Sequence, residues 1–233
     1  CARLPGETHL RRLPGGRAVE LAGGDLGLGQ HGAMVGDHQR RLALQPADHR
    51  LTGADIDGNW PEWMIWQEMH PEIIAFDGFD LLKTDVLADI DIDYLDFIYE
   101  GVISEIRLEE VVWGGVRARD GIPSLDYAAQ IPADEATYMN ADDLVFGISI
   151  NGDTRAYPLR IMNWHEMFND KIGGIDLALA YCTLCGSGIL YETLVDGADQ
   201  PLLFGSSGLL YRSNKLMFDH GSNSIWNQFT GRK

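Results

Sequence analysis

The chain has 233 residues and a formal net charge of −17 at pH 7, and 45% of its residues are hydrophobic. This length and composition suit one or two folded domains with a buried core and argue against wholesale disorder. The negative charge argues against nucleic acid as a partner, and no apolar run approaches the roughly 20 residues of a transmembrane helix.

The first 58 residues differ in composition from the rest of the chain. They contain seven Arg, seven acidic residues and many glycines, but no Phe, Tyr or Trp. Such a segment buries too little apolar surface to offset its ordering entropy, so we expect a disordered leader or a stretch that is not native to the protein. A mature lipoprotein end, acylated at Cys1, is the alternative. The four histidines of this segment are weak candidates for metal ligands.

Residues 59–117 are expected to form a helical flank. Three tryptophans recur at helical spacing (Trp60, Trp63 and Trp66) and predict an aromatic stripe packed against a core. An amphipathic helix is expected over 84–102, with Thr84 as its N-cap and an acidic outer face. Its expected inner face consists of Leu87, Ile90, Tyr94, Ile98 and Val102. The alternating sequence DIDID (89–93) favours a strand instead over part of this range.

The same stretch has the spacing of an EF-hand loop. Asp89, Asp91, Asp93 and Glu100 stand at positions 1, 3, 5 and 12 of such a loop. Its sixth position needs Gly for a sharp turn, and Tyr94 stands there. A solvated acidic face is therefore favoured over a calcium site.

Residues 118–233 predict an α+β domain whose C-terminal half is mainly antiparallel β-structure. Asn151-Gly152, between two β-rich runs, is typical of a type I′ hairpin turn. A short helix is then expected over 163–170, with Asn163 as its N-cap and Glu166 reaching back to it.

Cys182 and Cys185 form a CxxC pair between two predicted strands. Residues 175–181 alternate and end at Cys182, and residues 188–195 predict the next strand. In thioredoxin-like proteins CxxC opens a helix, whose N-terminus lowers the pKa of the first thiol. The sequence after Cys185 predicts no helix. A CxxC between strands is more typical of part of a metal site, which usually has four ligands.

His165 is the candidate third metal ligand, because its helix precedes the strand that leads to Cys182. Two thiolates and one imidazole suit zinc or copper. Asp219 and His220 are weaker candidates for a fourth position, and Glu166 or Asp219 is expected to orient or complete the ligand set. Thiol redox chemistry, inert buried thiols and a structural disulfide remain open. The competing class of function is a non-catalytic binding or scaffold domain.

Four segments carry a family resemblance: DGIPSLD, INGDTRAYPLRIMNWHEMFND, YCTLCGSGILYE and FGSSGLLYRSNKLMFDHGSNSIWNQFTG. Together, over about residues 120–232, they resemble the bacterial and archaeal family named domain of unknown function 3179. Members typically carry a YCPLCG-like motif, and some replace its second cysteine; Thr183 stands here at the usual proline.

The resemblance implies that Cys182 with His165 is the more essential pair. It also implies an extracytoplasmic location, because members are often exported, and a family pattern that continues past QFTGR. It implies no reaction and leaves the small-molecule or protein partner unassigned.

Overall fold

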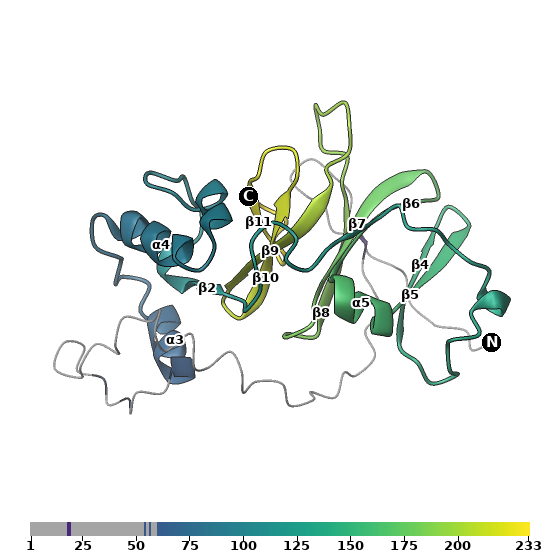
Figure 1. Cartoon of the computed structure of the whole chain (residues 1–233), viewed down its shortest axis with the longest axis horizontal. Helices are drawn as coiled ribbons and strands as arrows, with labels where there is room; N and C mark the ends of the chain where they lie inside the picture. Colours follow the sequence, from purple (N-terminus) through teal and green to yellow (C-terminus); the bar gives the residue numbers. More distant parts are fainter. Residues whose placement is uncertain (1–17, 20–53, 55, 57–59) are drawn as a thin grey trace.

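The computed structural model describes residues 18–19, 54, 56 and 60–233 (Figure 1). Within this part of the chain there are three α-helices, α3 (Trp60–Met69), α4 (Phe79–Ala88) and α5 (Leu159–His165). Three short 3-10 helices accompany them: η1 (Ile92–Asp96), η2 (Leu108–Glu110) and η3 (Ala133–Glu135). None of the described helices has the length and apolar character needed to cross a membrane. Apart from a two-residue strand, the expectations for residues 1–58 lie outside the described residues.

The described strands form three sheets. The five-stranded sheet has the order β1-β8-β7-β6-β3 and consists of β1 (Ala18–Val19), β3 (Leu125–Asp126), β6 (Met167–Ile172), β7 (Ile175–Cys182) and β8 (Ser187–Glu192). The four-stranded sheet has the order β11-β10-β9-β2 and consists of β2 (Val111–Trp113), β9 (Phe204–Tyr211), β10 (Asn214–Asp219) and β11 (Ile225–Asn227). A hairpin of β4 (Val145–Ile150) and β5 (Asp153–Pro158) is the third. Every pairing is antiparallel except β3 with β6, which confirms the predicted fold class.

The predicted turn at Asn151-Gly152 joins β4 to β5. Both residues have positive φ, 50° and 83°, as a type I′ turn requires. The Asn151 side-chain amide donates to the carbonyl of Gly173 at 2.9 Å, in the turn between β6 and β7. The two turns therefore hold the β4–β5 hairpin at one end of the five-stranded sheet.

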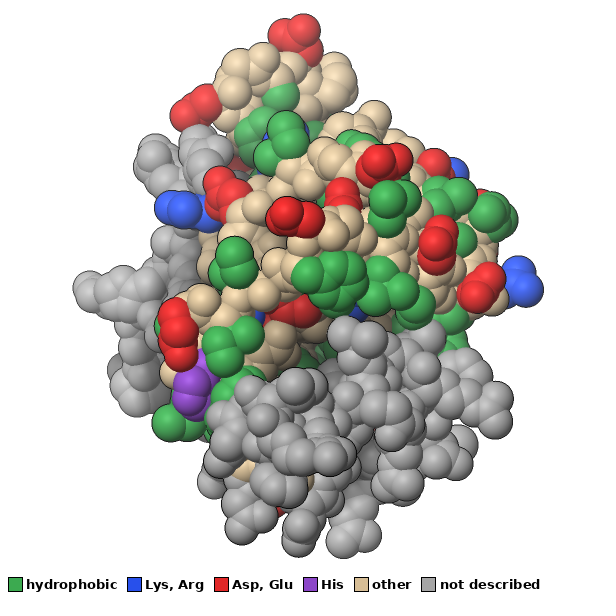
Figure 2. Space-filling view, turned by 90° about the vertical axis from the view of Figure 1, so that its left-hand side faces the viewer, with side chains coloured by type: hydrophobic (Ala, Val, Ile, Leu, Met, Phe, Trp, Pro, Cys, Tyr) green, Lys and Arg blue, Asp and Glu red, His purple; other side chains and the backbone are tan. Residues whose placement is uncertain are grey.

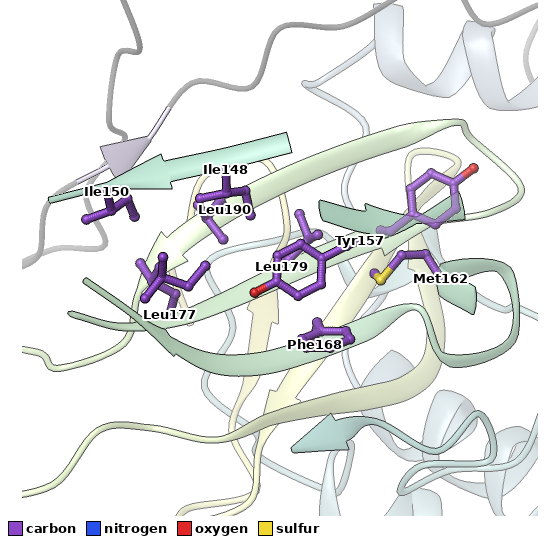
Figure 3. Packing of buried hydrophobic residues seen from close by; sticks show 10 residues of the cluster. Ile148, Ile150, Tyr157, Met162, Phe168, Leu177, Leu179 and Leu190 are labelled. Carbon is purple, nitrogen blue, oxygen red and sulfur yellow. The ribbon is translucent and has the colours of Figure 1, made fainter. Parts of the chain in front are cut away.

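Alternation along β7 divides the core of residues 118–233 into two parts. Leu177, Leu179 and Tyr181 face the β4–β5 hairpin, and Figure 3 shows the first two packed with Ile148 and Tyr157. The alternate residues, alanines 178 and 180, face the four-stranded sheet and pack in a second core with Phe204, Met217 and Trp226. The predicted strand and its apolar face are confirmed.

A third core joins the helical flank to the other face of the four-stranded sheet, beside which Figure 1 places α4. Leu87, Tyr94 and Ile98 are buried there, as the sequence predicts, but the continuous helix over 84–102 is wrong. The helix α4 ends at Ala88, and the Asp91 side chain caps η1 by accepting from the Asp93 amide at 3.2 Å. Aspartate competes with helical hydrogen bonding in this way, which also excludes the alternative of a strand over DIDID.

Two details of the flank also differ from the prediction. Thr84 lies inside α4, where its hydroxyl donates to the carbonyl of Asp80 at 2.7 Å, so it is not an N-cap. Trp63 and Trp66 are half-buried and pack edge-to-face at 5.6 Å between ring centroids. Neither belongs to one of the three cores.

The helix expected over 163–170 is wrong in both of its ends. The helix α5 begins at Leu159, directly after Pro158, and ends at His165. Glu166 has φ 55°, a left-handed conformation that terminates the helix, and β6 follows at once. Asn163 is therefore no N-cap, because it lies inside α5. Tertiary packing overrides the local capping pattern, since Glu166 is buried and its carboxylate is used elsewhere.

Candidate functional site around Cys182 and Cys185

The two cysteines lie at the tight turn that connects β7 to β8. Cys182 is the last residue of β7 and pairs with Ser187, the first residue of β8. The amides of Cys185 and Gly186 donate to the carbonyl of Cys182 at 3.3 and 2.9 Å. Both cysteines are free thiols, and their Sγ atoms are 2.6 Å apart. The expectation of a CxxC between two strands is thus confirmed.

The two thiols have different environments. Cys182 is buried, with 2% of its surface exposed, whereas Cys185 is partly exposed. The hydrogen bond between the two thiols lowers the pKa of Cys182, helped by the backbone amides of Cys185 and Lys215 and opposed by burial and by Glu166. The same hydrogen bond raises the pKa of Cys185. Cys182 is therefore the member of the pair that is favoured as a thiolate.

A buried ion pair lies beside the cysteines. The Glu166 carboxylate accepts from Thr183 Oγ1 at 2.6 Å with one oxygen and from Lys215 Nζ at 3.1 Å with the other. The amide of Tyr181 also donates to the Glu166 carbonyl at 2.7 Å. Through these contacts the end of α5 is fixed against both β7 and the cysteine turn.

The turn between β9 and β10 closes the site from the other sheet. Arg212 and Ser213 both have positive φ there, and the Ser213 carbonyl accepts from the thiol of Cys185. Directly after this turn, Asn214 accepts from the Ser187 hydroxyl at 2.6 Å. The cysteine turn is therefore held by contacts from Glu166 at the end of α5, from the β9–β10 turn and from β10.

His165 does not share these contacts. It is the last residue of α5, and its Nδ1 lies 2.9 Å from the carbonyl of Pro123. The structure thus brings together Cys182, Cys185 and Glu166 of the predicted site residues.

The two weaker candidates lie at the far end of β10. Asp219 is buried and accepts from Trp226 Nε1 at 2.8 Å and from the hydroxyl of Ser222 at 2.7 Å. His220 Nε2 lies 2.9 Å from Asp120 Oδ2, and this hydrogen bond raises the pKa of His220. Over the described residues, no group of three or more His, Cys, Asp and Glu side chains is arranged to hold a metal ion. The metal set of His165 with the two cysteines stays a prediction.

Two residues of the site were missed in the sequence. Lys215 lies in a strand, NKLMFD, in which all six residues are buried, and a lysine directly before the apolar run LMF is the signal that marks it. Gln228 is fully buried: its amide donates to the carbonyl of Ala180 at 2.7 Å and its Oε1 accepts from Asn214 at 2.7 Å. No local pattern marks Gln228, because its partners are distant in the sequence.

Comparison with known families gives one match. Residues 119–233 match the family model described as "Protein of unknown function (DUF3179)", a range that begins just before Asp120 and includes the whole cysteine site. No curated protein and no solved structure matches the chain.

Proposed function

Residues 119–233 belong to the DUF3179 family of proteins of unknown function, and we propose that this domain uses Cys182 and Cys185 as a dithiol–disulfide couple. The observation that carries the proposal is the 2.6 Å separation of the two sulfurs in a turn between strands. From this position a disulfide forms with a small movement of the side chains.

The unequal exposure of the thiols assigns their roles. In the oxidised form, a thiolate of a partner attacks the more accessible Cys185 sulfur, so that a mixed disulfide forms and Cys182 leaves as a thiolate. A second thiol of the partner then attacks the partner's sulfur in that mixed disulfide and releases Cys185 as a thiol. The partner's two sulfurs become a disulfide, and the two electrons reside on the Cys182 thiolate and on the Cys185 thiol, which takes the proton of the partner's second thiol.

The lowered pKa of Cys182 favours this direction. A thiol with a low pKa is a good leaving group, and a stabilised thiolate makes the reduced form of the couple more favourable. The site then oxidises dithiols in proteins or small molecules. An oxidant of this kind suits an oxidising compartment, so we place its work outside the cytoplasm. Fractionation of cells that produce the protein tests this location.

The test follows the two sulfurs one at a time. In glutathione redox buffers, the wild-type chain should pass between dithiol and disulfide, as measured by mass after thiol labelling. Cys182→Ser should accumulate a mixed disulfide with glutathione at Cys185, because the second cysteine is missing. Cys185→Ser should accumulate far less, because Cys182 is buried.

Leu184→Ala is the matched control, since Leu184 is exposed between the two cysteines and carries no thiol. It should behave as wild type. Thiols that stay reduced in every buffer would refute the redox role. If the wild-type chain instead binds one zinc or copper ion, and both Cys182→Ser and His165→Ala lose it, the redox role would be rejected in favour of the metal site.

A further inference from the structure

The helical flank has a surface that is both acidic and apolar. Residues 60–110 contain fourteen acidic side chains and two basic ones. Both basic groups are engaged internally: Lys83 Nζ donates to the carbonyl of Val111 at 2.8 Å, and Arg107 pairs with Glu109 at 2.8 Å. Of the nineteen large hydrophobic side chains exposed among the described residues, ten lie between Ile65 and Ile103. Figure 2 shows this mixture of apolar and acidic side chains, with few Lys or Arg among them.

Part of this surface is hollowed. A groove of about 650 Å³ runs between residues 96–106 and the four-stranded sheet. Its floor, on the sheet side, has the half-buried Tyr211 and Ile225 above the buried Leu209 and Leu216, and polar residues 222–224 and 227 line the groove beside them. Tyr99 and Ile103 stand on its outer wall, and Ile103 is 97% exposed. A volume of this size accommodates one or two large side chains of a partner or a small ligand.

The charges around the groove are unevenly placed. On the outer wall Glu105 is exposed, and neighbouring Glu100 is exposed as well. Asp96 lies on the same wall, where Arg119 pairs with it at 2.6 Å. Arg232 and Lys233 also line the groove, so its acidic charge is confined to the wall formed by residues 96–105. The outer wall therefore attracts cations, while the floor favours apolar groups.

We propose that this groove binds a cationic amphipathic helix of a partner protein. Apolar residues at every third or fourth position of such a helix would occupy the floor and contact Ile103. Lys and Arg residues beside that apolar stripe would face Glu100 and Glu105. Charge complementarity of this kind speeds association and fixes the orientation of the partner.

The test uses a fluorescent synthetic helix of Leu and Lys with an amphipathic pattern, titrated with the full chain. Ile103→Ser should weaken its binding about tenfold, because the large apolar side chain that the outer wall offers to the helix is lost. A residue with 97% exposure tolerates this change without unfolding. Ile131→Ser, at an exposed isoleucine outside the groove, should change binding by no more than about twofold. Added salt should weaken the complex.

Two further peptides decide whether the binding is specific. A peptide of the same composition with a scrambled pattern, and one with Glu in place of Lys, should both bind poorly. If the scrambled peptide binds as well as the patterned one, the attraction is due to net charge alone and the proposal is overturned. Binding of the patterned peptide by Ile103→Ser as tightly as by wild type would also overturn it. Self-association of the chain that Ile103→Ser abolishes would assign the groove to a second copy and overturn it too.

Discussion

The ammonium group of Lys215 on β10 lies 3.1 Å from Oε2 of Glu166, directly after α5, and both side chains are almost completely buried. Each charge depends on the other, because an unpaired charge in a protein interior costs several kcal/mol. The pair joins the end of α5 to the four-stranded sheet beside the cysteine turn, where Thr183 also contacts Glu166. It is therefore a structural support of the proposed redox site.

Lys215→Met should lower the free energy of unfolding by about 3–5 kcal/mol, because it leaves the Glu166 carboxylate buried without its cation. The double variant Glu166→Gln/Lys215→Met should lose much less than the sum of the single variants. Urea unfolding of wild type, Lys215→Met, Glu166→Gln and the double variant measures this coupling. If the losses of the two single variants add up to that of the double variant, the coupling is contradicted. Lys171→Met is the control: its pair with Asp176 is half-exposed at the lysine, so its loss should stay below about 1 kcal/mol.

Gly205→Ala should destabilise the protein by about 1–3 kcal/mol, because the new methyl group overpacks its surroundings. A Cβ at this position would lie 2.7 Å from His220 Nε2 and 2.6 Å from the ring of Phe218. Gly147→Ala in β4 is the control, since a Cβ there meets nothing within 4 Å. Thermal unfolding compares the two variants. Equal melting temperatures would show that the side chains of Asp120 and His220 move aside for the new methyl group without loss of stability.

The Asp120–His220 contact should make stability depend on pH. The hydrogen bond that the imidazole donates to the Asp120 carboxylate raises the pKa of His220 above its usual 6.5, so the folded state binds the proton more tightly than the unfolded state. This contribution is fully present below about pH 6.5 and is lost as the pH rises through the raised pKa.

His220→Gln keeps an amide donor for Asp120 but cannot take up a proton. The difference in unfolding free energy between wild type and this variant should thus be larger at about pH 5.5 than at about pH 8.5. A difference that does not change with pH would contradict the role of the imidazolium. Titration of the imidazole followed by NMR gives the pKa directly.

Gln228→Met should lower the free energy of unfolding by about 2–4 kcal/mol, because the change removes hydrogen bonds from buried polar groups. The groups affected are the Asn214 amide and the carbonyl of Ala180. Chemical unfolding measures the loss. Gln200→Met, at an exposed position before β9, should leave stability within about 0.5 kcal/mol of wild type. Similar effects of the two variants would show that solvent replaces the Gln228 contacts.

Strands and turns were predictable from the sequence where a single local requirement determines which residues can stand at each position. Alternation fixed the faces of β7, and the backbone requirement of a type I′ turn identified Asn151-Gly152. Prediction failed at Glu166, because its local sequence resembles a helical cap while its carboxylate is recruited by Lys215, forty-nine residues away. The CxxC was readily identified, but the contact of Cys185 with the Ser213 carbonyl was not, because packing between the sheets creates it.

Gln228 also limits how the cysteine motif can vary. Its amide reaches the carbonyls of Ala180 and Ser187 together, at 2.7 and 3.2 Å, one before the cysteine turn and one after it. A residue inserted between Cys182 and Cys185 would displace Ser187 from Ala180 along the hairpin, so that one carboxamide could no longer serve both. The two hydrogen bonds of Gln228 therefore constrain the number of residues between Cys182 and Cys185. This constraint does not involve the sulfur atoms, so it would apply even in a relative with no second thiol.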